Sequence, residues 1–265
     1  MKLEEHFALA RSPFPKAATP ASLLRTPAVE HAIERLRFAL ERDTIALLVA
    51  ESGCGKSTVL FELAQSLDAA HYHLLAVSLT TLQPFSLLAQ FLASMGLPAN
   101  RGNKGETATA LLRHLRALAK HSVLLIDEAH LLPDSSLEDL RLLSADNLDR
   151  QSPFSLVLVG QPILRDRLAE PQHYSLWQRI GVRLRLRPLS EQELARFLDR
   201  HMQAAGATAR IFEPPAVSEI FHHSRGIPRL VQNLALDAML AAMSAGKKSV
   251  DSEAVQQAFV DMEAL

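Results

Sequence analysis

The stretch Ala50-Glu51-Ser52-Gly53-Cys54-Gly55-Lys56-Ser57-Thr58 decides how this chain folds. An apolar run, 45–50, leads into it and a helical pattern, 59–67, follows it, which predicts a strand, a phosphate-binding loop and a helix. Gly53 and Gly55 allow a tight turn with inward N–H groups, and the helix that begins near Lys56 adds the positive end of its dipole. The loop is therefore predicted to cradle phosphate oxygens.

Two side chains of this loop are assigned to a nucleotide and its metal ion. Lys56 would neutralise the β- and γ-phosphates of ATP, and the Ser57 hydroxyl would occupy one coordination position of Mg²⁺. The other predicted nucleotide-binding residues of the loop are Gly53, Cys54, Gly55 and Thr58. Ala50 stands where the usual motif has its first glycine, and alanine fits there if its φ stays negative. The alternative, an ordinary glycine-rich turn, is disfavoured by the strand and helix on either side.

Composition bounds the class of protein. With 265 residues and 48% hydrophobic content, the chain can bury a sizeable core and is predicted to form two domains. No apolar run approaches the roughly 18 residues that span a bilayer, and residues 1–11 are too polar for a signal peptide, so we expect a cytoplasmic protein without a membrane segment. A single cysteine excludes an internal disulfide framework and argues against a cysteine-based zinc site. The net charge of −1 gives no global signal for nucleic acid.

A second motif supplies carboxylates. Residues 123–126 are apolar, and Asp127 and Glu128 follow them, which describes a buried parallel strand whose carboxyl end meets solvent. Ligands gather at such ends in open α/β sheets. Asp127 can hold Mg²⁺ directly or through water, and Glu128 can orient and polarise the water that attacks the γ-phosphate. The alternative is an acidic pair that caps the following helix.

Two further segments are predicted strands. Each carries or precedes polar residues for which two roles are possible. Residues 155–160 form a buried strand that ends before Gln161, whose amide could bind the γ-phosphate or the attacking water, or could belong to an ordinary loop. Residues 182–187 alternate apolar and arginine side chains. Their basic face is either a solvated face or a contact with phosphate or another subunit.

The order of patterns predicts three parts. Residues 1–26 are a proline-punctuated arm, residues 27–189 an α/β domain with a parallel sheet, and residues 190–265 a small all-helical domain. We expect strands at 44–50 and 72–79, an exposed loop at 96–105, and a helix at 106–120. In the helical part, Ser190 and Glu193 form a predicted capping box, and Asp251 is predicted to cap the last helix.

Taken together, these residues resemble the AAA+ branch of phosphate-loop ATPases over nearly the whole chain. The matching elements are Gly53-Cys54-Gly55-Lys56-Ser57 (Walker A), 124–128 (Walker B), Val159-Gly160-Gln161 (first sensor), Trp177-Gln178-Arg179-Ile180 (arginine-finger region) and Gly226-Ile227-Pro228-Arg229 (second sensor). More narrowly, the segments 6–14, 126–132 and 158–162 look like a bacterial family. That family joins the general-secretion-pathway A-type ATPases to helper ATPases of DNA transposition, the TnsC and Mu B kind.

The resemblance implies a fold and a shared site. It implies a five-stranded parallel sheet in the order 5-1-4-3-2, a helical lid over the nucleotide, and oligomers in which one subunit completes its neighbour's site. Arg179 would then reach the γ-phosphate of the adjacent subunit, with Arg183 as the nearest rival. Arg229 would contact the phosphates of its own subunit.

The resemblance also implies two competing functions. Secretion-type relatives add a membrane segment and a cell-wall-binding domain, which this sequence does not show, so we expect an oligomeric helper that binds double-stranded DNA and recruits a transposase. The alternative is an ATPase for secretion or envelope assembly that acts with a membrane partner. A third hypothesis, a nucleotide sensor without hydrolysis, is disfavoured by Glu128.

The segment 101–120 carries five basic residues and one acidic residue, Glu106. The candidate DNA contacts are these basic residues: Arg101, Lys104, Arg113, Arg116 and Lys120.

Overall fold

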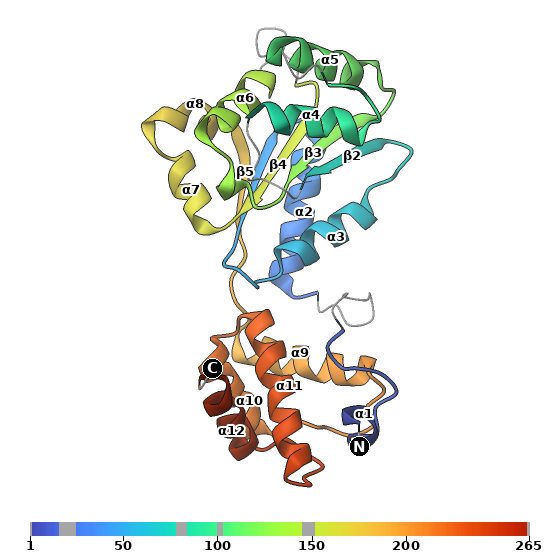
Figure 1. The fold of residues 1–265 in the computed structure, drawn as a ribbon, viewed down its shortest axis with the longest axis vertical. Coiled ribbons are helices and arrows are strands. Elements are labelled where there is room, and N and C mark those ends of the chain that lie inside the picture. Colours follow the sequence, from blue (N-terminus) through green and yellow to red (C-terminus); the bar gives the residue numbers. More distant parts are fainter. Residues whose placement is uncertain (1, 16–24, 78–83, 100–102, 145–151, 264–265) are drawn as a thin grey trace. The chain divides into compact units, whose positions relative to one another are not determined.

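The computed structural model describes residues 2–15, 25–77, 84–99, 103–144 and 152–263. The chain divides into two compact units, whose elements are labelled in Figure 1. The α/β unit comprises Val29–Ser52 and Val59–Leu186. The helical unit comprises Arg187–Leu265 together with two segments distant in sequence, Met1–Ala28 and Gly53–Thr58. Within the described part of the chain, no helix combines the length and apolar character needed to cross a membrane.

One parallel sheet organises the α/β unit. Its strands are β1 (Ile45–Val49), β2 (Tyr72–Val77), β3 (His121–Ile126), β4 (Ser155–Gly160) and β5 (Ile180–Arg185). They are ordered β2-β3-β4-β1-β5, and every neighbouring pair is parallel. This confirms the five-stranded order that the resemblance implied. The register places Val49 opposite both Gly160 of β4 and Arg185 of β5.

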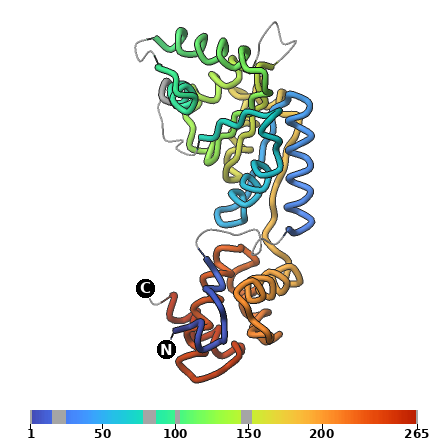
Figure 2. Tube along the Cα trace, turned by 90° about the vertical axis from the view of Figure 1, so that its right-hand side faces the viewer, coloured from blue at the N-terminus to red at the C-terminus, as the bar shows by residue number. Residues whose placement is uncertain are grey.

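The helices of this unit cover both faces of the sheet. Figures 1 and 2 show α2 and α4 on opposite faces of it. In β1, Leu47 joins the main hydrophobic core, while its neighbour Leu48 is equally buried, as expected for a strand covered on both faces. The helical elements are α2 (Pro27–Glu41), α3 (Lys56–Ser66), α4 (Pro84–Ser94), α5 (Lys104–Ala117), η1 (Ala129–Leu131), α6 (Asp134–Ser144), α7 (Pro162–Leu168), η3 (Pro171–His173) and α8 (Tyr174–Arg179).

The helical unit is built from α1 (Leu3–His6), α9 (Glu191–Ala204), α10 (Pro214–Ser224), α11 (Pro228–Ser244) and α12 (Ser252–Glu263). Two of these helices begin at the capping residues that the sequence predicted. Ser190 Oγ accepts a hydrogen bond from Glu193 N at 3.3 Å, and Ser190 N donates to Glu193 Oε2 at 2.8 Å, which completes the capping box before α9. Asp251 Oδ1 accepts from Ala254 N at 2.9 Å at the start of α12.

The N-terminal arm is part of this helical unit. Phe7 and Leu9 are buried in its hydrophobic core. Ala10 N donates to Ala205 O at 2.8 Å, and His201 Nδ1 lies 2.9 Å from Pro13 O. Burial lowers the pKa of His201. The arm therefore contributes core side chains and backbone hydrogen bonds to helices that follow it by nearly 200 residues in sequence.

Several expected boundaries differ from the structure, among them that of the strand expected at 182–187, which is β5 at Ile180–Arg185. The loop expected at 96–105 ends earlier, because Lys104 and Gly105 already lie in the first turn of α5. Asn103 starts this helix, since its Oδ1 accepts from Glu106 N at 3.1 Å. The helix ends at Ala117, three residues before the expected end. Of the strand expected at 72–79, residues 78 and 79 lie outside the described residues.

Candidate nucleotide site

The predicted phosphate loop runs from the end of β1 to the start of α3. Gly53 has φ +81° and Gly55 has φ +90°, so both lie in the left-handed region that side chains other than glycine rarely occupy. Lys56 is buried at the first position of α3, and Ser57 beside it is exposed. The 11-residue helix presents its first N–H groups and its positive dipole end to the loop. This arrangement suits the phosphate groups of a nucleotide.

Ala50, which departs from the usual motif, is accommodated as an extension of β1. Its N–H donates to Gly160 O of β4 at 3.1 Å, and its side chain is fully buried. Its φ is not positive. Because the position needs neither a left-handed backbone nor open space, alanine serves here without strain.

The carboxylates and the amide lie at the carboxyl ends of adjacent strands. Asp127 and Glu128 follow β3, Gln161 follows β4, and the phosphate loop leaves β1, which is the next strand in the sheet. Parallel strands end at one edge of a sheet, so β3 and β4 present these side chains at the edge from which the loop departs. The sheet topology thus brings together the acidic and amide residues predicted from distant parts of the sequence.

Glu128 has an unusual backbone conformation. Its φ and ψ are 53° and 33°, in the left-handed region, and Glu128 N donates to Asp127 Oδ1 at 2.8 Å. Although Glu128 occupies the cap position of η1, its side chain makes no capping hydrogen bond. The helix-cap alternative therefore does not account for the Glu128 carboxylate. A strained non-glycine residue of this kind costs on the order of 1–3 kcal/mol and is typical of functional sites.

Gln161 and Arg229, the arginine predicted to act as second sensor, lie at helix starts. Gln161 precedes α7 and is half-buried, and its side chain makes no capping hydrogen bond. Arg229 lies in the first turn of α11, and Arg229 N lies within hydrogen-bonding distance of Gly53 O, at 3.3 Å. A Cβ added to Gly53 would come within 2.8 Å of the Arg229 Cβ. The predicted phosphate loop is thus in direct contact with the segment predicted as second sensor, and both belong to the helical unit.

The two candidate finger arginines have different surroundings. Arg179 is the last residue of α8 and is half-buried. Arg183, on the exposed side of β5, places its guanidinium carbon 3.8 Å from the centre of the Trp177 ring and donates from Nη2 to Trp177 O at 2.8 Å. Arg183 is therefore held against its own subunit by stacking and by a hydrogen bond.

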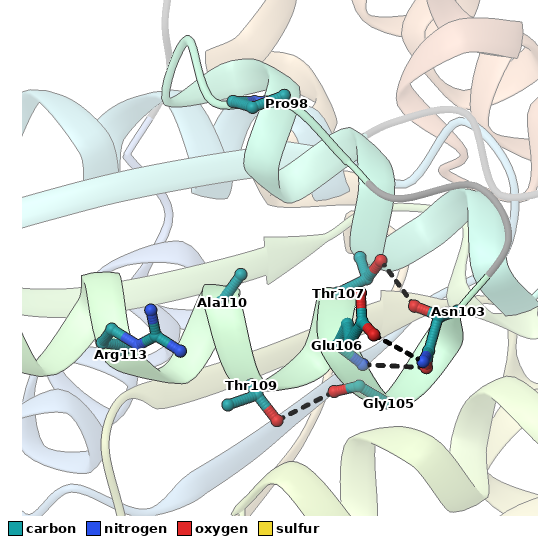
Figure 3. Close-up of a pocket in the computed structure, with 8 residues that line it drawn as sticks. All are labelled: Pro98, Asn103, Gly105, Glu106, Thr107, Thr109, Ala110 and Arg113. Atoms are coloured by element: carbon teal, nitrogen blue, oxygen red, sulfur yellow. Dashed lines mark hydrogen bonds between the residues drawn. The ribbon is translucent and has the colours of Figure 1, made fainter.

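The candidate DNA contacts are not equivalent. Lys104 Nζ lies 2.6 Å from Asp139 Oδ2, and Lys120 Nζ donates to Ala69 O at 2.7 Å. Arg113 and Arg116 are exposed on α5, and Arg101 lies outside the described residues. Arg113 lines an open hollow of about 680 Å³, which Figure 3 shows between Pro98 and α5. The positive charge of Lys104 is thus partly compensated, whereas that of Arg113 faces the hollow.

A polar cluster beside Glu128 was not predicted from the sequence. His130 Nδ1 lies 3.3 Å from Glu128 Oε2, and Arg167 Nη1 donates to His130 O at 2.6 Å. Asp134 and His173 continue the cluster. The only sequence signal was the position of His130 two residues after Glu128, while Arg167 and His173 lie far along the chain.

Comparison with known proteins places this geometry in a family. Residues 39–168 match the family model described as AAA domain. General secretion pathway protein A of Aeromonas hydrophila is 34% identical over 254 residues, which cover 93% of this chain and 46% of that protein. The Mu-like prophage FluMu DNA transposition protein B of Haemophilus influenzae is 27% identical over 177 residues, which cover 63% of this chain and 58% of that protein.

The fold is also that of a solved structure. The ORC1 protein of Aeropyrum pernix, in complex with DNA, superimposes with a TM-score of 0.68 at 20% identity, over 91% of this chain and 67% of that one. The chain spans about half the length of the curated relatives it matches. The AAA-domain match, the parallel sheet in the order β2-β3-β4-β1-β5 and the positive-φ glycine loop before α3 together show that the chain belongs to the AAA+ ATPase family.

Proposed function

We propose that the protein binds ATP at the phosphate loop and hydrolyses it. The observation that carries this proposal is the Glu128 carboxylate, held in a left-handed backbone at the sheet edge from which the phosphate loop departs. Lys56 and the N–H groups of α3 bind the phosphates. Ser57 and Asp127 supply oxygen atoms that fit Mg²⁺, which when bound neutralises charge on the β- and γ-phosphates.

The chemistry that the chain's residues perform is the activation of water. Glu128 accepts a hydrogen bond from a water molecule and receives its proton while the water oxygen bonds to the γ-phosphorus. The bond from that phosphorus to the bridging oxygen breaks, which leaves ADP and inorganic phosphate. Gln161 donates from its amide to the γ-phosphate or to the same water. Removal of the carboxylate should block hydrolysis and spare binding.

We further infer that the active site is shared between subunits. Arg179 reaches the γ-phosphate bound by a neighbouring subunit, and Arg229 contacts the phosphates in its own subunit. Positive groups aimed at the charge that develops on a transferring phosphoryl group contribute about 10³ to 10⁵ in rate. The contact between Arg229 N and Gly53 O supports the second assignment.

At the level of biology, we propose an ATP-dependent DNA-binding helper of transposition. The protein assembles on double-stranded DNA with ATP, recruits a transposase, and disassembles after hydrolysis. Two observations support this: the similarity to a protein named DNA transposition protein B, and the exposed arginines of α5. Repetition of weak phosphate contacts in an oligomer would strengthen DNA binding.

A second candidate function rests on the 34% identity with general secretion pathway protein A over 93% of this chain. In that case the protein drives a step of secretion or envelope assembly with a membrane partner.

Gel filtration and electron microscopy with a nonhydrolysable ATP analogue, with and without duplex DNA, distinguish the transposition role from the secretion role. A large assembly that requires both ATP analogue and DNA supports the transposition helper. Assembly that depends on nucleotide but not on DNA favours the secretion role. A protein that stays monomeric under all conditions contradicts both proposed roles.

A further inference from the structure

The side chain of Glu128 meets a sheltered histidine. His130 Nδ1 lies 3.3 Å from Glu128 Oε2, and only 10% of the His130 side chain is exposed, against 39% for Glu128. Among the described residues, His130 Nδ1 is buried without a hydrogen bond of good geometry. The carboxylate therefore reaches toward solvent while one of its oxygen atoms faces a ring nitrogen that is shielded from water.

The backbone of His130 is fixed from two sides. At the end of β4, a Cβ on Gly160 would lie 3.2 Å from His130 N and 3.4 Å from His130 Nδ1, so the glycine leaves room for the close approach. On the other side, Arg167 of α7 donates from Nη1 to His130 O at 2.6 Å and from Nη2 to Leu132 O at 2.9 Å. Two backbone carbonyls of one short segment are thus held by a single guanidinium.

The same arginine continues the network toward α8. Arg167 Nη2 donates to Asp134 Oδ1 at 2.5 Å, and His173 Nε2 lies 3.0 Å from the same oxygen. These hydrogen bonds, from Arg167 first and then from His173, lower the pKa of Asp134. The His173 side chain is only 4% exposed, and His173 directly precedes α8, whose last residue is Arg179. Polar contacts therefore run from Glu128 to the helix that carries the candidate finger.

We propose that His130 is the positioning residue that holds the Glu128 carboxylate in its water-orienting conformation, with Arg167 anchoring His130. The inference rests on the proposed hydrolytic role of Glu128. An exposed carboxylate on a strained backbone has several rotamers available, and a contact with a buried, fixed ring selects one of them. A catalytic base that is displaced by about 1 Å loses on the order of 100-fold in rate. His130 touches neither substrate nor metal in this scheme and acts only through Glu128.

The test compares three variants of the full chain. His130→Leu removes the ring nitrogen, and His130→Asn keeps a side-chain nitrogen near the position of Nδ1. His121→Leu is the matched control, because it removes a partly buried histidine that contacts Ser155 Oγ at 2.9 Å at the opposite end of β3. Steady-state hydrolysis gives kcat and KM, titration with a fluorescent ATP analogue gives Kd, and thermal melting verifies folding.

The expected result is a lower kcat with nearly unchanged ATP binding. His130→Leu should lower kcat by about 10- to 100-fold while KM and the Kd for the analogue change by less than about twofold. His130→Asn should recover most of the lost kcat, and His121→Leu should keep the wild-type kcat. A merely structural role would lower the melting temperature and kcat alike in His130→Leu and His130→Asn, without rescue.

Several outcomes would overturn the inference. Wild-type kcat in His130→Leu, equal loss in the Leu and Asn variants, or a loss explained by weaker ATP binding each contradicts the positioning role. If His130→Leu does not fold, His130→Gln replaces it, because its nitrogen reaches the place of Nε2 and should not restore kcat as Asn does. Glu128→Gln is measured in parallel. If Glu128→Gln still hydrolyses ATP, the proposed hydrolytic role of Glu128 is itself contradicted. If Glu128→Gln is inactive while His130→Leu is fully active, only the proposed role of His130 is contradicted.

Discussion

Lys56 combines a positive charge with burial at the first turn of α3, next to a loop with two left-handed glycines. A lysine beside the first N–H groups of a helix and a glycine turn places positive charge where phosphate oxygen atoms can be bound. We predict that Lys56→Ala weakens ATP binding at least tenfold, measured by titration with a fluorescent ATP analogue. The circular dichroism spectrum should stay unchanged. Wild-type affinity in a folded Lys56→Ala protein would contradict the loop assignment.

Substitution of Glu128 should separate ATP binding from ATP hydrolysis. Glu128→Gln keeps the size of the side chain and removes the group that accepts the proton of the attacking water. We predict a fall in kcat of about 10² or more with the Kd for ATP preserved, because general base catalysis contributes about 10² to 10⁴ in rate. Release of inorganic phosphate measures the rate, and equilibrium binding measures the Kd. A Glu128→Gln protein that hydrolyses ATP at the wild-type rate would exclude this carboxylate as the base.

At the scale of single elements, Glu193 at the start of α9 both forms an ion pair and caps the helix. Glu193 accepts hydrogen bonds from Arg187 Nη1 at 2.7 Å and from Ser190 N at 2.8 Å. Its pKa is lowered to about 2 from an ordinary value of 4.5, mainly by the side-chain hydrogen bonds from Arg187. A carboxyl group whose pKa is lower in the folded state stabilises the fold above its unfolded pKa, and this contribution is lost as the pH falls toward the folded pKa.

We therefore predict a pH-dependent effect of Glu193→Gln. At pH 7 the substitution should lower the free energy of unfolding by about 1 kcal/mol, because glutamine can still accept the cap hydrogen bond from Ser190 N but loses the ion pair with Arg187, which solvent screens. The difference from the wild type should shrink as the pH falls from 4.5 to about 2. Urea unfolding followed by circular dichroism at several pH values measures it. A difference that does not depend on pH would show that the Glu193 carboxylate is not the source.

At the scale of the whole molecule, Arg179 and Glu128 serve different subunits in the proposed assembly. Arg179→Ala should bind ATP and fail to hydrolyse it, as Glu128→Gln does. When the two variants are mixed, some interfaces combine an intact Glu128 with an intact Arg179 from the neighbour, so turnover should partly return. Phosphate release from the mixture tests this, after light scattering shows that mixed oligomers form. No recovery in mixed oligomers would contradict a finger that acts in trans, and the same experiment with Arg183→Ala tests its rival.

DNA binding is also a property of the assembly. Arg113 is exposed on α5, whereas Lys104 is paired with Asp139 at 2.6 Å. We predict that Arg113→Ala weakens binding of the ATP-bound oligomer to duplex DNA and reduces its salt dependence, because each lost phosphate contact is repeated in every subunit. Lys104→Ala is the matched control and should have the smaller effect. Fluorescence anisotropy at several salt concentrations measures both, and equal effects would contradict α5 as the DNA-facing helix.

The sequence by itself determined the parts of this protein that depend on neighbouring residues. The phosphate loop, the capping box at Ser190, the helix cap at Asp251 and the buried strand before Asp127 all follow from short patterns, since strand periodicity, turn geometry and helix capping act over a few residues. Element boundaries also depended on single side-chain contacts: α5 begins at Lys104, two residues before the expected start, because Asn103 Oδ1 accepts from Glu106 N and caps the helix there.

Only the tertiary structure decided which distant residues meet. The contact of Glu128 with His130 depends on Gly160 and Arg167, which come from other elements. Likewise, the docking of the N-terminal arm on α9 and the approach of Arg229 to Gly53 join segments that no local pattern relates. Such contacts are selected by the packing of whole elements, because close approach and burial depend on the shapes of both partners at once. The sequence therefore identified the chemical groups, and the fold selected the neighbours that position them.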